Sequence, residues 1–176
     1  MPDEARLERT DSGLKPASQG WFVVNVGETA WAVHDAFGSG CTFESREFPF
    51  RQLGINVNVV HPGQPLCLYH EEEAQEDFLI LAGECVLLVN EQERPLRAWD
   101  FFHCPAGTPH ALVAAGTEPC VALAFGARKS RDTVYLVDAT AARHGASVER
   151  ETTSSQEAYA GTPDPVDGPA PRLPRP

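Results

Sequence analysis

The sequence is short of basic residues and of long apolar runs. Its 14 Lys and Arg residues are outnumbered by 25 Asp and Glu residues, which gives a net charge of −11. A site for nucleic acid or an anionic membrane needs a basic patch that displaces counterions, so we expect neither partner. No stretch reaches the ~18 apolar residues of a membrane-spanning helix. The charged N-terminus has no apolar run, so we expect no signal peptide.

Closely paired cysteines are also missing. The five cysteines are widely spread and form no CxxC pattern, so neither a cysteine zinc site nor a disulfide framework is predicted. Four of them lie in apolar, strand-like runs, as expected for buried thiols in a reducing compartment. We therefore predict a cytoplasmic protein. There is no internal repeat, and 176 residues are enough for one domain.

Short apolar strands separated by turns fill the middle of the chain. In residues 53–62, LGINVNVVHP, apolar and polar residues alternate, as in a strand whose two faces differ. A short helix ended by Gly145 is an alternative for residues 138–151. About ten short strands with turns between them predict an all-β sandwich or barrel. The other expected strands cover residues 21–26, 29–35, 77–82, 84–90, 94–99, 100–104, 110–115, 120–126 and 133–137.

The two ends of the chain differ in composition from the middle. Residues 1–19 carry few large apolar groups and are expected to form a flexible arm. The stretch TPDPVDGPAPRLPRP at the C-terminus contains six prolines, which predicts a disordered Pro-rich tail over residues 151–176. Residues 20–150 are then expected to form a single β-barrel domain.

Potential metal ligands gather in residues 62–83, PGQPLCLYHEEEAQEDFLILAG. Alternation places His70 and Glu72 on one face of a strand, and Glu76 begins the inward face of the next strand. His110, after the turn PAGTP, is a fourth candidate. Imidazole and carboxylate ligands suit Zn, Mn or Fe better than Cu(I). A solvated acidic turn with two ordinary histidines is the alternative that spacing alone leaves open.

Two motifs in this sequence resemble those of the cupin superfamily, whose members are small jelly-roll β-barrels. The first family motif reads G, five residues, H-x-H, three or four residues, E, six residues, G. Here His70, Glu76 and Gly83 match it, and Glu72 replaces the second histidine. The second motif reads G, five residues, P-x-G-x-x-H, three residues, N. Pro105, Gly107 and His110 match this motif. Trp99 replaces its leading glycine, and Ala114 replaces its final asparagine.

The resemblance implies a cupin-type jelly-roll barrel that binds a divalent metal ion, Zn, Mn or Fe, through His70, Glu72, Glu76 and His110. If Glu72 is not a ligand, it could serve as a catalytic base. The function expected is a metal-dependent enzyme of isomerase, lyase or oxygenase type on a small polar metabolite. The alternative is a non-catalytic module that binds a sugar or an acid. A small-molecule ligand and a homodimer are the partners expected.

Other residues are weaker candidates for a role at this site. Alternation allows only one of His103 and Cys104 to face the barrel interior, and Gln75 could orient a ligand by a hydrogen bond. Three arginines could bind a substrate carboxylate, although solvated surface charge explains them equally well. They are Arg46, Arg51 and Arg97.

Overall fold

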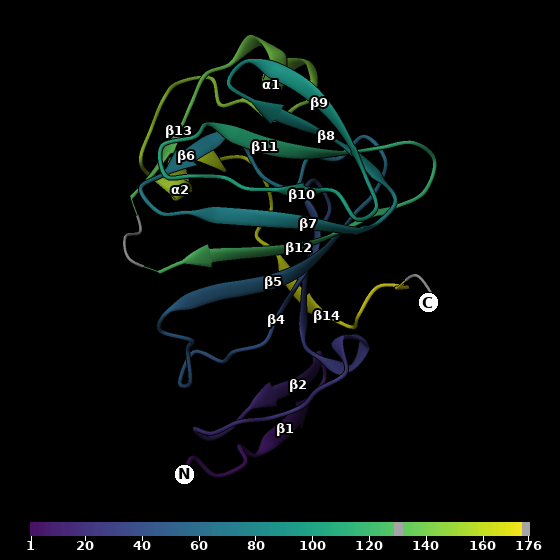
Figure 1. Cartoon of the computed structure of the whole chain (residues 1–176), viewed down its shortest axis with the longest axis vertical. Helices are drawn as coiled ribbons and strands as arrows, with labels where there is room; N and C mark the ends of the chain where they lie inside the picture. Colours follow the sequence, from purple (N-terminus) through teal and green to yellow (C-terminus); the bar gives the residue numbers. More distant parts are fainter. Residues whose placement is uncertain (129–131, 174–176) are drawn as a thin grey trace.

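Two antiparallel sheets face one another and form a barrel, and a separate hairpin lies at one end of the molecule (Figure 1). The computed structural model describes residues 1–128 and 132–173. The all-β jelly-roll barrel predicted from the sequence is confirmed.

The larger sheet has seven strands in the order β10-β7-β12-β5-β4-β3-β14. In the same order its strands are Phe101–Phe102, Glu76–Ala82, Cys120–Ala127, Leu53–Val60, Gly38–Thr42, Trp31–His34 and Val166–Gly168. The smaller sheet has five strands in the order β13-β6-β11-β8-β9. They are Thr133–Tyr135, His70–Glu72, His110–Ala115, Glu84–Val89 and Gln92–Arg97.

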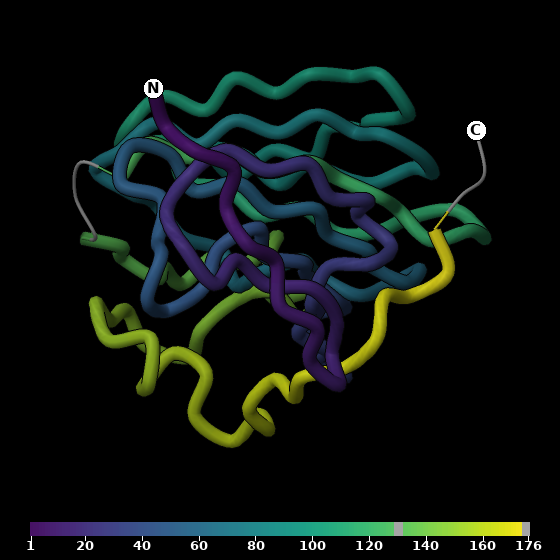
Figure 2. The backbone as a smooth tube through the Cα atoms, turned by 90° about the horizontal axis from the view of Figure 1, so that it is seen from below, coloured from purple at the N-terminus to yellow at the C-terminus, as the bar shows by residue number. Residues whose placement is uncertain are grey.

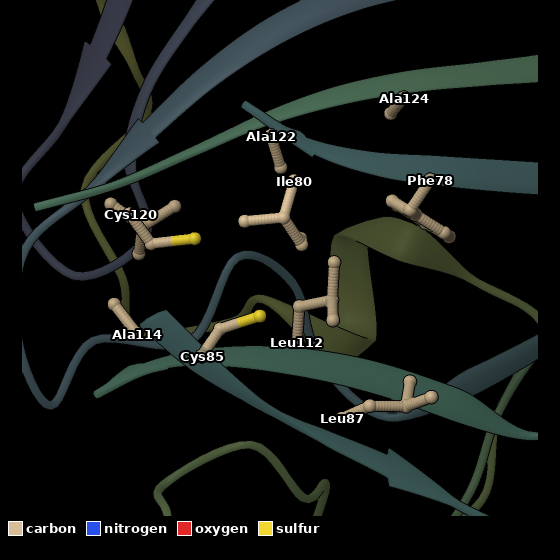
Figure 3. Close-up of a cluster of buried hydrophobic side chains, with 10 residues drawn as sticks. Phe78, Ile80, Cys85, Leu87, Leu112, Ala114, Cys120, Ala122 and Ala124 are labelled. Carbon is tan, nitrogen blue, oxygen red and sulfur yellow. The ribbon is translucent and has the colours of Figure 1, made fainter. Parts of the chain in front are cut away.

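The main core lies between the two sheets (Figure 3). Alternation along β7 turns Phe78 and Ile80 inward, and alternation along β11 turns Leu112 and Ala114 toward them. Ile80 is fully buried. Because Glu76 and His110 precede these core residues in the same alternation, both enter the barrel interior from opposite sheets.

The flexible arm and the disordered tail stay predictions from composition, and the structure places regular elements in the described parts of both chain ends. The N-terminal segment forms a hairpin of β1 (Leu7–Thr10) and β2 (Gly13–Pro16). After α1 (Ala139–Arg143), the chain follows the outside of the barrel (Figure 2), forms α2 (Ser155–Ala158) and adds β14 to the edge of β3. The C-terminal segment is rich in proline, but a few of its apolar groups pack on the barrel. The domain limits at residues 20 and 150 stay a prediction.

Two local predictions have different outcomes. A strand over residues 21–26 is wrong, because Trp21 and Val23 are exposed and the segment leads into the 3-10 helix η1 (Val26–Glu28). The short helix before Gly145 is confirmed as α1, with the side chain of Asp138 accepting a hydrogen bond from Ala141 N. Neither helix in residues 1–128 and 132–173 has the length and apolar character needed to cross a membrane.

Candidate metal centre

Two histidines meet on neighbouring strands of the smaller sheet. His70 begins β6 and His110 begins β11, and the two residues stand directly opposite each other in the antiparallel pair. Their ring centroids are 4.8 Å apart. Both side chains are buried, with 7% and 1% of the residue exposed. Strand pairing therefore fixes the distance between two imidazoles inside the barrel.

Glu76 reaches the same point from the other sheet. Its Oε2 lies 3.3 Å from His110 Nε2 and 3.8 Å from His70 Nε2. One ligand atom from each of the three residues can be chosen so that all lie within 4.8 Å of one another. Two imidazoles and a carboxylate thus converge from three strands.

The hydrogen bonds on the far side of each ring determine what the converging atoms can do. His70 Nδ1 donates to the carbonyl oxygen of Leu68 at 2.7 Å, and His110 Nδ1 donates to that of Thr108 at 2.9 Å. A carbonyl oxygen can only accept, so in each neutral ring Nε2 carries a lone pair. While both rings are neutral, two lone pairs and a carboxylate oxygen point at one another. A proton on a ring nitrogen or a cation between the three groups relieves this repulsion, and the residues fit a divalent metal ion.

The pKa values of these groups reflect the same arrangement. Burial disfavours a charged His70 ring, but interactions with Cys67 and Glu76 outweigh it and hold the pKa of His70 well above its ordinary value. Burial also opposes ionisation of Glu76, yet hydrogen bonds from His110 and His70 lower its pKa to about 2. Without a metal, the site therefore retains a proton next to an ionised carboxylate.

Glu72 lies beside this group and not within it. Its Oε1 is 3.8 Å from His70 Nε2 and accepts a hydrogen bond of 3.3 Å from Thr133 Oγ1. Burial, followed by the charge of Glu76, raises the pKa of Glu72. The three converging residues are those of a two-histidine, one-carboxylate site, with a further carboxyl group next to it.

A pocket of about 310 Å³ adjoins the centre. Glu72, Glu76 and Thr133 form one part of its wall, and Asn56 and Arg128 form another. The sequence argument missed Asn56 and Arg128. Alternation could have predicted Arg128, because it follows Ala122, Ala124 and Gly126 at a spacing of two residues along β12 and its end. A larger hollow, between the β1–β2 hairpin and residues 42–49, contains no residue of the centre.

The weaker candidates have other roles. Cys104 is the inward residue of its pair, and its Sγ lies 3.3 Å from His110 Nδ1. His103 is largely exposed and its Nδ1 lies 2.8 Å from a buried Asp77 carboxylate oxygen. The amide of Gln75 donates to Asp77 at 2.6 Å, and its role in orienting a ligand stays a prediction. The arginine on the pocket wall is Arg128, which was not among the three expected.

The departure of the second motif at Trp99 has a structural counterpart. Trp99 adopts a left-handed conformation, with φ of 75°, that normally favours glycine. Two backbone hydrogen bonds tie this turn to Ile80: Trp99 N donates to the Ile80 carbonyl at 2.7 Å, and Ile80 N donates to the carbonyl of the next residue, Asp100, at 3.0 Å. Trp99 therefore stands at the position of the motif glycine in a conformation that glycine adopts readily.

The fold and the site define a β-barrel protein with a buried cluster of two histidines and a glutamate. Residues 57–126 match the family profile of the cupin domain. The resemblance to the cupin superfamily that the two motifs predict is confirmed over these residues. Comparison with curated proteins gives no match.

Solved structures share the fold of this chain. The polyketide cyclase RemF from Streptomyces resistomycificus aligns with a TM-score of 0.54 and 14% identity over 62% of this chain and 80% of that one. A predicted oxalate decarboxylase from Thermotoga maritima aligns with a TM-score of 0.52 and 22% identity over 60% of this chain and 98% of that one. At these identities the likeness concerns the fold alone.

A third structure is more similar in sequence but aligns over a smaller part. This candidate sugar phosphate isomerase from Acidithiobacillus ferrooxidans is 27% identical, with a TM-score of 0.44, over 48% of this chain. The alignment spans 55% of the length of that protein. It therefore carries no argument about activity.

Proposed function

We propose that this protein is a metal-dependent enzyme that acts on a small polar metabolite in the pocket beside His70, Glu76 and His110. The supporting observation is that two imidazoles and a carboxylate converge beside a pocket whose wall includes Glu76. They would hold one divalent cation, Zn, Mn or Fe. When bound, the cation would polarise a carbonyl or hydroxyl oxygen of the substrate. A homodimer and a cytoplasmic location remain predictions from the sequence.

Glu72 is the residue to which we assign proton transfer. It lines the pocket, and its pKa is raised by burial and by the charge of Glu76. A bound cation would oppose that rise, while the hydrogen bond from Thr133 holds the carboxylate in place. A carboxyl group beside a polarised oxygen can move a proton on an adjacent carbon or oxygen. Within the three reaction types, this favours isomerisation or elimination over oxygenation.

The pocket itself suggests the class of substrate. Its volume of about 310 Å³ is at the low end of the roughly 300–1,000 Å³ of ligand sites. Arg128 places a guanidinium group on its wall, where it pairs with Glu44. A substrate carboxylate or phosphate could take the place of Glu44 in a bidentate pair. We therefore expect a small organic anion with a second oxygen for the metal.

This function is tested by incubating metal-loaded protein with small hydroxy acids, keto acids and sugar phosphates. A substrate should raise the melting temperature and be converted, as followed by NMR. Glu72→Gln should then lower kcat by about 10²- to 10⁴-fold, the usual contribution of a general acid or base. Arg128→Gln should mainly raise KM, because it removes uniform binding of the anionic group.

Glu71→Gln is the matched control, since Glu71 is a neighbour of Glu72 on the same strand and is outside the pocket lining. It should leave kcat and KM unchanged. A ligand that stabilises the metal-loaded protein but is returned unaltered would favour the non-catalytic binding module instead. Protein that takes up no metal from supplemented medium would contradict the metal centre.

Metal binding is expected to stabilise the protein more at higher pH. His70 must lose its proton before its Nε2 can bind a cation, and its pKa lies well above the ordinary 6.5. In metal-free protein this raised pKa contributes stability that is complete below about pH 6.5 and is lost as the pH rises through the raised value. The gain in melting temperature caused by Mn²⁺ should therefore grow from about pH 6 to about pH 8. Thermal unfolding with Mn²⁺ or with EDTA measures it, and a gain independent of pH would contradict the prediction.

A further inference from the structure

Residues 152–159 pack on the barrel next to β13 and next to Leu68, which precedes β6. Thr152 and Tyr135 exchange two backbone hydrogen bonds, of 2.9 and 3.2 Å, which adds the segment to the edge of β13. The segment then forms α2 and ends that helix at Tyr159. Figure 2 shows this part of the chain following the outside of the barrel. It contacts the barrel close to the strand that carries His70.

A chain of two hydrogen bonds links Tyr159 to the ring of His70. The hydroxyl oxygen of Tyr159 accepts the N–H of Leu68 at 3.2 Å. The carbonyl oxygen of Leu68 in turn accepts His70 Nδ1 at 2.7 Å. Leu68 lies outside the strands, two residues before β6. No strand ladder therefore fixes the residue that orients the first histidine.

Ring packing provides a second connection between the same residues. The ring of Tyr159 packs edge-on against Tyr135, with centroids 5.6 Å apart, and Tyr135 packs against His70 at 5.9 Å. Phe37 holds Tyr159 from another side at 5.1 Å. Leu68 and Tyr135 belong to one buried cluster, against which Tyr159 packs. Both connections run from the C-terminal segment to one metal ligand.

We infer that Tyr159 is a positioning residue for His70, so that the C-terminal segment 152–159 controls the affinity of the metal centre. This inference rests on the proposed function. A histidine ligand depends on the partner of its other ring nitrogen, and loss of such a partner costs roughly 10- to 100-fold in metal affinity. Tyr159 acts one hydrogen bond further away. Its hydroxyl should therefore be worth about 3- to 10-fold in affinity, below that range.

The test is Tyr159→Phe, which removes the hydroxyl and keeps the packed ring. Tyr69→Phe is the matched control, because the Tyr69 hydroxyl also accepts a backbone N–H, that of Glu91 at 3.3 Å, with no hydrogen bond to Leu68. Mn²⁺ affinity is measured by titration, and the tautomer and hydrogen bonding of His70 by NMR of the imidazole nitrogens in metal-free protein. Tyr159→Phe should weaken Mn²⁺ binding about 3- to 10-fold and change the His70 Nδ1 signal. Tyr69→Phe should change neither.

The two readouts separate the two proposals. Equal Mn²⁺ affinity and an unchanged His70 signal in Tyr159→Phe would overturn the positioning role while leaving the metal centre intact. Wild-type protein that binds no Mn²⁺, Zn²⁺ or Fe²⁺ would overturn the proposed function. In that case a changed His70 signal in Tyr159→Phe would still support the positioning role. An equal loss of affinity in both variants would mean general destabilisation and would count against a specific role for Tyr159.

Discussion

Glu76→Gln is expected to abolish tight binding of a divalent cation. Glu76 supplies the carboxylate between two imidazoles, and its pKa of about 2 keeps it ionised throughout the neutral range. A neutral amide at the same position removes the only negative charge in the group of three and offers a weaker oxygen ligand. The loss of affinity should exceed the roughly 10- to 100-fold caused by losing an outer hydrogen-bond partner. Titration with Mn²⁺ and elemental analysis of purified protein measure it.

Glu71→Gln is again the appropriate control, because it removes one charge from the same strand as His70 and Glu72. Glu71 lies outside the group of three, so the Glu71→Gln protein should bind Mn²⁺ as tightly as the wild type. Thermal unfolding in EDTA shows whether each variant is folded. A Glu76→Gln protein that is folded and binds metal as tightly as wild type would mean that the cation is held elsewhere.

Gly83→Ala is expected to cost about 3–5 kcal/mol of stability, from left-handed strain and steric overlap together. Gly83 joins β7 to β8 with φ of +73°. A Cβ there would lie 2.4 Å from the carbonyl oxygen of Pro119 and 2.9 Å from Cys120 Cα. These are backbone atoms, so the turn or the neighbouring strand must move. Urea unfolding followed by tryptophan fluorescence measures the change.

Gly107→Ala separates the two causes of that loss. Gly107 has nearly the same φ, +71°, but a Cβ there meets nothing within 4 Å. This variant should therefore lose only about 1–2 kcal/mol, the cost of the left-handed conformation alone. Equal losses at the two glycines would show that the contact with Pro119 is relieved without cost. The two variants together measure how much each motif glycine contributes to stability through its conformation and through the space around it.

The sequence supported a good part of the candidate site because alternation along a strand is a local property. Glu76, Phe78 and Ile80 are spaced by two residues, and the structure places the last two in the core and the first at its end. Spacing of the motifs added His110, which belongs to a strand far along the chain. Alternation along one strand does not predict which strands pair with one another. Only the register of β6 and β11 brings His70 opposite His110.

The surroundings of Glu72 were beyond the sequence for the same reason. Its position on the face of His70 predicts a fourth ligand, which stays a prediction, and in the structure Thr133 donates a hydrogen bond to it beside the group of three. That contact joins residues 61 positions apart. Composition also says nothing of the path of the C-terminal segment, whose prolines and polar residues predict disorder. A few apolar contacts, such as Tyr159 against Phe37, decide its path along the barrel.

The sequence by itself predicted an all-β barrel of the cupin kind and named the three converging side chains among its candidates, because alternation and motif spacing act over a few residues. The tertiary structure decided what surrounds them. Arg128 lines the pocket, and Tyr159 bonds to Leu68 across 91 residues. Such contacts depend on how whole strands and the outer segment pack. A side chain distant in sequence becomes part of a site only when the fold brings it there.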